Sequence, residues 1–152
     1  IESEEHAKKI IRPVVFTMSA VSVVINAYDK ILVEGISVDG LMTFYEKIVP
    51  QGGRGKGYEK WQSIKLMDGI LEALCKKAGV TVDVYSAISP LYILHDYRIL
   101  LDHLLPKEKQ DDTKQHIVDT LNVQCFEEQE TIYLEEIRRL NKLYAMLSIL
   151  TK

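Results

Sequence analysis

The side chains best suited to chemistry gather in residues 91–105, a segment whose pattern predicts one amphipathic helix. At about 100° per residue, its apolar side chains form one broad face. The opposite side carries the charged and titratable residues His95, Asp96, Arg98, Asp102 and His103. Arg98 can pair with Asp102 one turn later, and His95 lies in line with both. The pattern therefore fits either a reactive surface or a solvated helix face with an ion pair.

Histidine and aspartate in this segment are also of the types that bind metal ions. They occur as two doublets, His95-Asp96 and Asp102-His103, and adjacent positions on a helix point about 100° apart. Neither doublet can converge on one ion unless further ligands, such as His116, come from elsewhere. We therefore predict no metal site and no cofactor.

Glycines recur in residues 52–57, where they alternate with Arg54 and Lys56. The backbone N–H groups of such a loop can converge on an anion, and the two cations add positive charge. A contact with phosphate or an RNA backbone is one interpretation. The loop lacks the lysine and the serine or threonine that follow the last glycine of a Walker motif, since Tyr58 and Glu59 stand there. A flexible basic connection between helices is the other interpretation.

The spacing from Arg98 to His103, after the apolar lead-in 91–97, has the form Arg-x4-His. It resembles the Arg-x4–6-His motif of the HEPN superfamily, the helical nucleotide-binding domains common in bacterial toxins and defence proteins. Pro106, an amphipathic stretch after it and a long last helix also resemble C-terminal domains of this kind in bacterial proteins. Before residue 85 the chain resembles the family only in being helical. Ile99 stands where the family commonly has a polar residue.

The resemblance implies a metal-independent endoribonuclease of toxin or defence type that acts as a homodimer. It implies that His103 moves a proton at the ribose 2′-hydroxyl or the leaving 5′-oxygen. Arg98 would hold the scissile phosphate, Asp102 would orient either residue, and His95 would assist. Residues five apart on an ideal helix point about 140° from each other, so a kink or a second subunit is needed to bring both to one phosphate.

The alternative is that the domain has the same fold but no catalytic activity. A helical domain of this kind can serve as a dimerisation or protein-interaction module of a larger protein. In the last helix, apolar residues recur at heptad spacing: Phe126, Tyr133, Ile137, Leu140, Tyr144 and Leu147, with Leu134, Leu143 and Leu150 beside them. Such a seam either packs inside the bundle or forms a contact between two copies.

Composition places the chain among folded globular domains. Hydrophobic residues make up 47% and charged residues 27% of 152, which suits one domain with a real core. The net charge of −3 gives no general attraction to nucleic acid or anionic lipid, so an RNA contact would need a local basic patch. Cys75 and Cys125 are far apart and are expected to be free thiols in a reducing compartment.

No targeting or membrane segment is expected. The most apolar stretch, Pro13–Ile25, has 13 residues, whereas a membrane span needs about 20. We therefore expect a soluble cytoplasmic protein without a membrane partner. Because the chain begins at Ile1 and not at methionine, we expect it to be a C-terminal piece of a larger polypeptide.

Helical periodicity, caps and breakers predict an all-α antiparallel bundle of five to seven helices, HEPN-like in arrangement. Residues 1–12 are expected to be a linker or a helical lead-in, and residues 13–152 a single helical-bundle domain. A strand at residues 21–25 is the alternative for the first long helix, because valine is β-branched. The predicted helices cover residues 13–33, 39–49, 58–78, 81–88, 89–105, 107–121 and 126–150.

Overall fold

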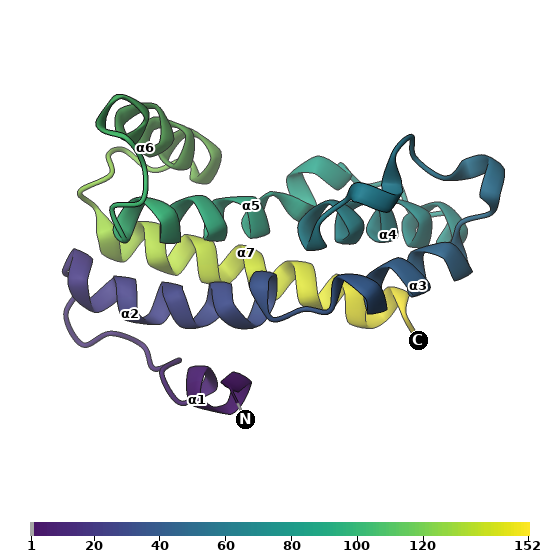
Figure 1. The fold of residues 1–152 in the computed structure, drawn as a ribbon. Helices are drawn as coiled ribbons and strands as arrows, with labels where there is room; N and C mark the ends of the chain where they lie inside the picture. The colour runs from purple at the N-terminus through teal and green to yellow at the C-terminus, as the bar shows by residue number, and fades with distance from the viewer. Residues whose placement is uncertain (1) are drawn as a thin grey trace.

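The computed structural model describes residues 2–152, and these fold as an all-α helical bundle, which confirms the predicted fold class (Figure 1). Ile1, on which the expected truncation rests, lies outside the described residues. The strand considered for residues 21–25 is absent, since the described part of the chain is helical there. The seven α-helices are α1 Glu2–Ala7, α2 Met18–Asp29, α3 Val38–Ile48, α4 Ser63–Ala78, α5 Val84–Leu101, α6 Lys107–Leu121 and α7 Gln129–Leu150.

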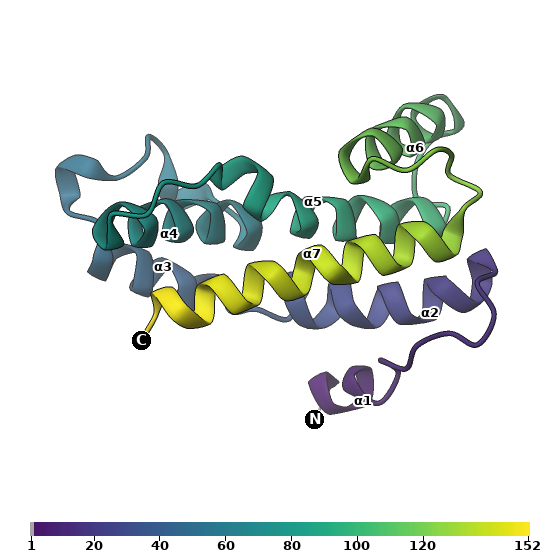
Figure 2. The same ribbon diagram turned by 180° about the vertical axis from the view of Figure 1, so that it is seen from behind.

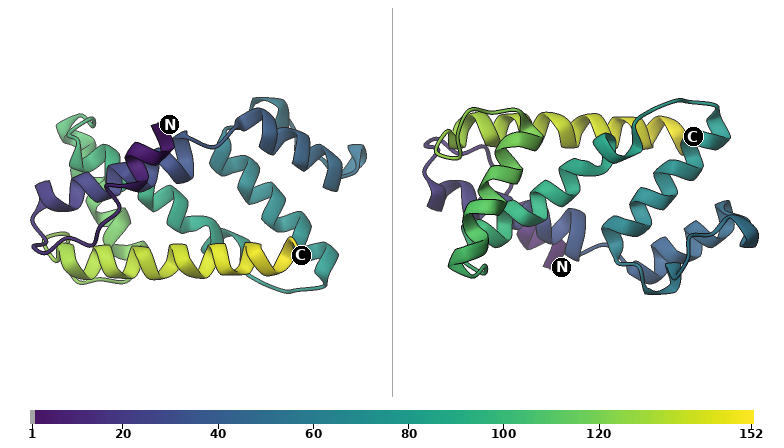
Figure 3. Two further views of the ribbon diagram at one scale, coloured as in Figure 1. Left: turned by 90° about the horizontal axis from the view of Figure 1, so that it is seen from below. Right: turned by 90° about the horizontal axis from the view of Figure 1, so that it is seen from above.

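Helix α5 is the centre of the bundle. It packs against α2, α4, α6 and α7. Helices α2 and α7 both run opposite to α5, and α7 extends along most of the length of the molecule (Figures 1 and 2). Helix α6 crosses the end of α5, and α3 packs against α4 at the other end (Figure 3).

The main hydrophobic core lies where α2, α5, α6 and α7 meet. Ile25, Leu94, Ile117 and Ile132 come from these four helices in turn, and none has more than a trace of exposed surface. Full burial of one such side chain contributes about 1.5–3 kcal/mol. A second cluster joins α3 to α4, and Leu147 of α7 packs against both clusters. The C-terminal helix therefore ties the two ends of the molecule together.

The first long helix begins later than the sequence predicted. Residues 13–17 are not helical, so the predicted helix start at residue 13 is wrong. Helix α2 begins at Met18 because Thr17 caps it, with the Thr17 hydroxyl accepting from the Ala20 N–H at 3.2 Å. Beyond Asp29 the chain continues as a π-helical turn, Lys30–Glu34, where the sequence predicted regular helix.

The predicted helix start at Ser89-Pro90 is also wrong. Helix α5 runs through Pro90 from Val84 to Leu101 and so joins two predicted helices into one. Proline lacks an N–H and leaves the carbonyl one turn earlier without its usual donor. Here the Ser89 hydroxyl donates to the Ser86 carbonyl at 2.9 Å, which satisfies that oxygen. The helix ends at Leu101 and not at residue 105.

The heptad seam of α7 packs inside the bundle. Tyr133, Leu140 and Leu143 are buried in the main core, and Tyr144 and Leu147 pack against it. Of the two interpretations of the seam, internal packing is confirmed for these residues, so the seam no longer supports a contact between copies. The widening residue Leu134 stays outside the core and is 41% exposed.

The glycine-rich loop after α3 is a packed connection. The Gly55 N–H donates to the Tyr45 hydroxyl at 3.0 Å, and the Tyr45 ring packs against Trp61. A β-carbon at Gly55 would lie 2.3 Å from the Trp61 ring. We expect Gly55→Ala to destabilise the protein by about 1–3 kcal/mol, since the indole must move out of a packed site. Urea denaturation checks this; Gly52→Ala, where a β-carbon meets nothing within 4 Å, is the control.

Candidate functional site

The buried carboxylate of Asp29 is the centre of the polar cluster between α2 and α5. Asp29 is the last residue of α2 and has no exposed surface. Its Oδ1 lies 3.1 Å from His95 Nδ1, and its Oδ2 lies 3.8 Å from Arg98 Nη1. His95 and Arg98 are three residues apart on α5 and therefore share the face that packs on α2. Their charges compensate a carboxylate that would be costly to bury alone, although Oδ2 accepts no hydrogen bond from residues 2–152.

Two of the three guanidinium nitrogens of Arg98, Nε and Nη1, have partners in this cluster. Nη1 donates to Glu34 at 2.8 Å, and Nε donates to the Asn26 side-chain oxygen at 3.1 Å. Nε also lies 3.3 Å from the Asp102 carboxylate, which confirms the predicted pairing of Arg98 with Asp102. Glu34 reaches Arg98 from the end of the π-helical turn, which places it beside α5, and also pairs with Lys30.

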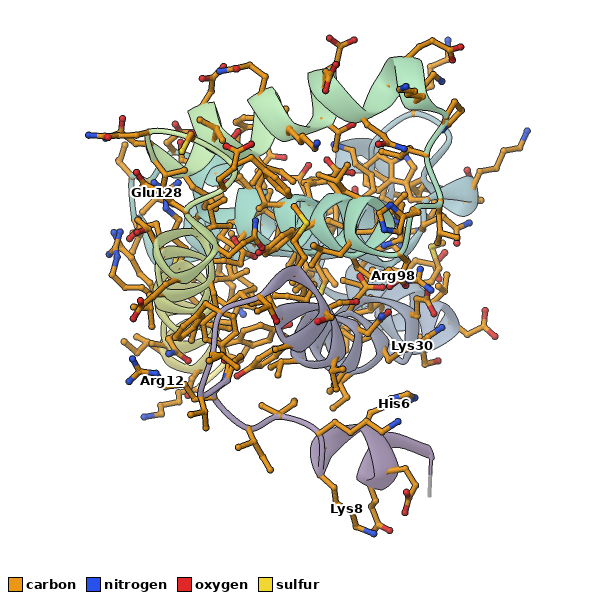
Figure 4. The ribbon with its side chains drawn as sticks, turned by 90° about the vertical axis from the view of Figure 1, so that its left-hand side faces the viewer. His6, Lys8, Arg12, Lys30, Arg98 and Glu128 are labelled. Atoms are coloured by element: carbon orange, nitrogen blue, oxygen red, sulfur yellow. The ribbon has the colours of Figure 1, made fainter. Side chains whose placement is uncertain are left out.

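Negatively charged side chains surround Arg98 in this cluster. Three carboxylates, Asp29, Glu34 and Asp102, surround a guanidinium whose side chain is 17% exposed. Lys30 supplies the second permanent cation, and Figure 4 shows it on the same side of the bundle as Arg98. An approaching phosphate would meet these carboxylates around the guanidinium.

The pKa shifts agree with a cluster of paired charges. The hydrogen bond to Asp29 raises the pKa of His95, against the opposing effect of burial. The hydrogen bond from Lys30 lowers the pKa of Glu34, and the charge of Arg98 lowers it further. His95 therefore pairs with Asp29 on α2, and it lies in the same cluster as Arg98 and Asp102, as the helical wheel predicted.

His103 lies apart from this cluster, past the end of α5. Its backbone is left-handed, with φ 55°. Its N–H donates to the Leu100 carbonyl at 3.2 Å, and the Leu104 N–H donates to the Ile99 carbonyl at 3.0 Å. This pair of hydrogen bonds is the Schellman helix ending. The chain does change direction between Arg98 and His103, because α5 ends there. Within one chain, however, this turn places His103 in different surroundings from Arg98.

Those surroundings are a cavity of about 610 Å³. His103, Ser22 and Lys114 contribute to its wall, and Arg98 does not. Ser22 joins the cavity to the charged cluster, because its hydroxyl donates to Asp102 at 3.2 Å. The four predicted catalytic residues are thus divided: His95, Arg98 and Asp102 form the cluster, and His103 faces the cavity.

Arg54, predicted to contact phosphate or RNA, holds the glycine-rich loop in place. It donates to the carbonyls of Glu46 at 2.9 Å and Val49 at 3.1 Å, and to the Tyr58 hydroxyl at 3.2 Å. The interpretation of this loop as a flexible connection is wrong for Arg54, whose hydrogen bonds fix it. Lys56 is exposed, so its predicted RNA contact stays a prediction.

Comparisons with known proteins assign no family: neither family models, nor curated proteins, nor solved structures give a significant match. The HEPN resemblance therefore stays a prediction. Within residues 2–152, no helix is both long enough and apolar enough to span a membrane. The same residues contain no group of three His, Cys, Asp or Glu side chains placed to hold a metal ion.

Several residues of the site were not foreseen from the sequence. Asp29 and Glu34 lie outside the segment 91–105, and only the packing of α2 on α5 shows that they meet Arg98. Asp29 did carry a signal, since it is an acidic residue directly after an apolar run. Lys114 carried none, because lysine on an exposed helix is commonplace.

Proposed function

We propose that the chain is a non-catalytic helical interaction module that pairs with a second copy of itself. The observation that carries this proposal is the apolar surface formed by the segment before α2 and by Met18, the first residue of α2. Ile11 is 70% exposed, Val14 97%, Val15 62% and Met18 44%. Contiguous exposed apolar side chains of this kind mark interaction surfaces. A twofold contact uses the same patch on both copies, so one patch of this kind suffices.

The segment is held against the bundle at defined points. The Phe16 ring packs on Tyr133 of α7 with centroids 5.7 Å apart, and Arg12 lies over the Phe16 ring at 5.9 Å. The apolar side chains on either side of Phe16 are therefore presented from an anchored backbone. This preorganisation reduces the entropy lost when a second copy binds.

The state of Arg98 supports a non-catalytic role. A guanidinium that binds a scissile phosphate needs free donors. Nε and Nη1 of Arg98 are engaged by Asn26 and by carboxylates of this same chain, and three carboxylates surround the guanidinium. We propose that Arg98 braces α2 against α5.

Sedimentation equilibrium of the wild type and of the double variant Val14→Asp/Val15→Asp tests this function. We expect a dimer that dissociates in the double variant, because two carboxylates would have to be buried in an apolar contact. Ile149→Asp is the control, since Ile149 is 69% exposed at the far end of α7. A wild type that stays monomeric up to about 0.1 mM, or a double variant that dimerises as well as the wild type, contradicts the proposal.

A metal-independent ribonuclease is the second candidate, favoured by the position of His103 in the wall of a cavity that also contains Lys114. Incubation with single-stranded and structured RNA in EDTA tests it. This candidate predicts cleavage that is lost in His103→Asn, a variant whose side chain tolerates the left-handed backbone. Intact RNA after incubation with the wild type excludes it for those substrates and leaves the interaction module.

A further inference from the structure

We infer that the cavity beside the end of α5 binds a small organic monoanion, a carboxylate attached to an apolar or aromatic body. This inference goes beyond the proposed self-association, which uses the apolar segment before α2, although Met18 belongs to both surfaces. The cavity of about 610 Å³ falls within the size range of small-molecule sites. Its wall is contributed by α2, α5, α6 and Phe126, so it lies where four parts of the chain meet.

Two basic side chains in the wall are uncommitted. Lys114 of α6 forms no ion pair and His103 forms no side-chain hydrogen bond with any residue from 2 to 152. The Lys114 ammonium lies over the Phe126 ring at 5.5 Å, which keeps it at the wall. Arg98, in the neighbouring cluster, shows the opposite state, with carboxylates around it. The cavity therefore offers donors that an anion can accept.

His103 also adopts the left-handed backbone conformation, in which histidine is enriched among the residues other than glycine. Three helices end in the left-handed conformation, at Gly79, His103 and Asn122. Glycine adopts this conformation at little cost, and asparagine, aspartate and histidine adopt it more often than other residues do. At the end of α5 this conformation places an imidazole in the wall of the cavity.

The rest of the wall defines the body of the ligand. Met18, Leu100, Leu101 and Phe126 supply apolar surface, and a ligand that covers it gains from burial. The charge of the wall selects a monoanion, because Lys114 is its one permanent cation. Asp102 lies behind Ser22 and disfavours a second negative charge on the ligand.

Titration of the ¹⁵N-labelled protein with 3-phenylpropionate, followed by NMR, tests the site. We expect amide shifts centred on His103, Gln110 and Lys114, with a dissociation constant of about 1 mM or lower. The neutral amide, 3-phenylpropionamide, is expected to bind about tenfold more weakly, since it cannot pair with the ammonium. Acetate is expected to bind at least about tenfold more weakly, because it lacks the apolar body.

Variants assign the binding to named side chains. We expect Lys114→Ala to weaken binding about tenfold and His103→Asn to weaken it several-fold while the left-handed backbone is kept. Lys142→Ala is the matched control, since Lys142 lines a different cavity, between α5 and α7, and should leave the affinity unchanged. Absent shifts at about 10 mM, shifts centred elsewhere, or equal affinity for the amide would overturn the inference.

Discussion

Replacing Arg98 with alanine is expected to destabilise the protein by about 3 kcal/mol at neutral pH. The substitution removes the guanidinium beside the fully buried Asp29 and leaves His95 as its remaining partner. It also leaves Glu34 and Asp102 without their shared cation. A buried charge that loses a partner costs far more than an exposed ion pair contributes. Urea denaturation monitored by circular dichroism measures the change.

The pH dependence of this defect gives a second readout. Asp29 raises the pKa of His95 in the folded protein. The ion pair therefore contributes its full stabilisation below the pKa that His95 has in the unfolded chain. This stabilisation is lost as the pH rises through the pKa that His95 has in the folded protein. The Arg98→Ala defect should therefore be larger at about pH 8 than at about pH 5.5. Arg138→Ala is the control, because its partner Glu135 is also held by Arg139. Equal stability of Arg98→Ala and wild type would show that Arg98 is not a brace.

This expectation changes how RNA assays should be interpreted. Loss of cleavage in Arg98→Ala alone would not distinguish a missing phosphate ligand from a weakened fold. His103→Asn avoids the ambiguity, since the His103 side chain forms no ion pair or hydrogen bond with the described residues.

Replacing Glu136 with methionine is expected to stabilise the protein by about 2 kcal/mol at about pH 8. Glu136 of α7 has no exposed surface, and neither carboxylate oxygen has a hydrogen-bond partner in residues 2–152. Burial raises its pKa well above the usual value. Methionine has similar length and no charge, so it removes an unsatisfied polar group from the core. Thermal and urea denaturation measure the gain.

The sign of the pH dependence separates Glu136 from its neighbour. Because burial raises the pKa of Glu136 in the folded protein, Glu136 costs the protein no stability by ionisation below the pKa that it has in the unfolded chain. The free energy of unfolding then falls as the pH rises toward the folded pKa. Hydrogen bonds from Arg138 and Arg139 lower the pKa of Glu135 to about 2, so its contribution is present above the unfolded pKa and is lost on acidification. Glu136→Met should gain most at high pH, and Glu135→Met should gain nothing there. A Glu136→Met protein no more stable than wild type at about pH 8 would refute this expectation.

Periodicity and caps were enough to predict most of the fold. The predicted helix ends at residues 78 and 121 agree with α4 and α6, because Gly79 and Asn122 end these helices in the left-handed conformation. The errors arose where tertiary packing outweighed a local signal. Pro90 is tolerated within α5 because the Ser89 hydroxyl satisfies the freed carbonyl and the surrounding core holds the helix.

The candidate site was less predictable than the fold. Helical periodicity correctly predicted that Arg98 lies next to Asp102, since that pair lies within one helix. It could not show that Asp29 and Glu34 meet Arg98, because these contacts depend on the packing of α2 on α5. Nor could it show that α5 ends before His103 and turns it toward the cavity.

A double-mutant cycle between Asp29 and Arg98 tests most directly whether the arginine serves the fold. The stabilities of Asp29→Asn, Arg98→Met and the combined variant give the coupling energy between the two side chains. We predict a coupling of about 2 kcal/mol, with the combined variant more stable than Arg98→Met alone. A coupling energy below about 0.3 kcal/mol would mean that Arg98 does not stabilise the fold through Asp29, which would contradict its structural role.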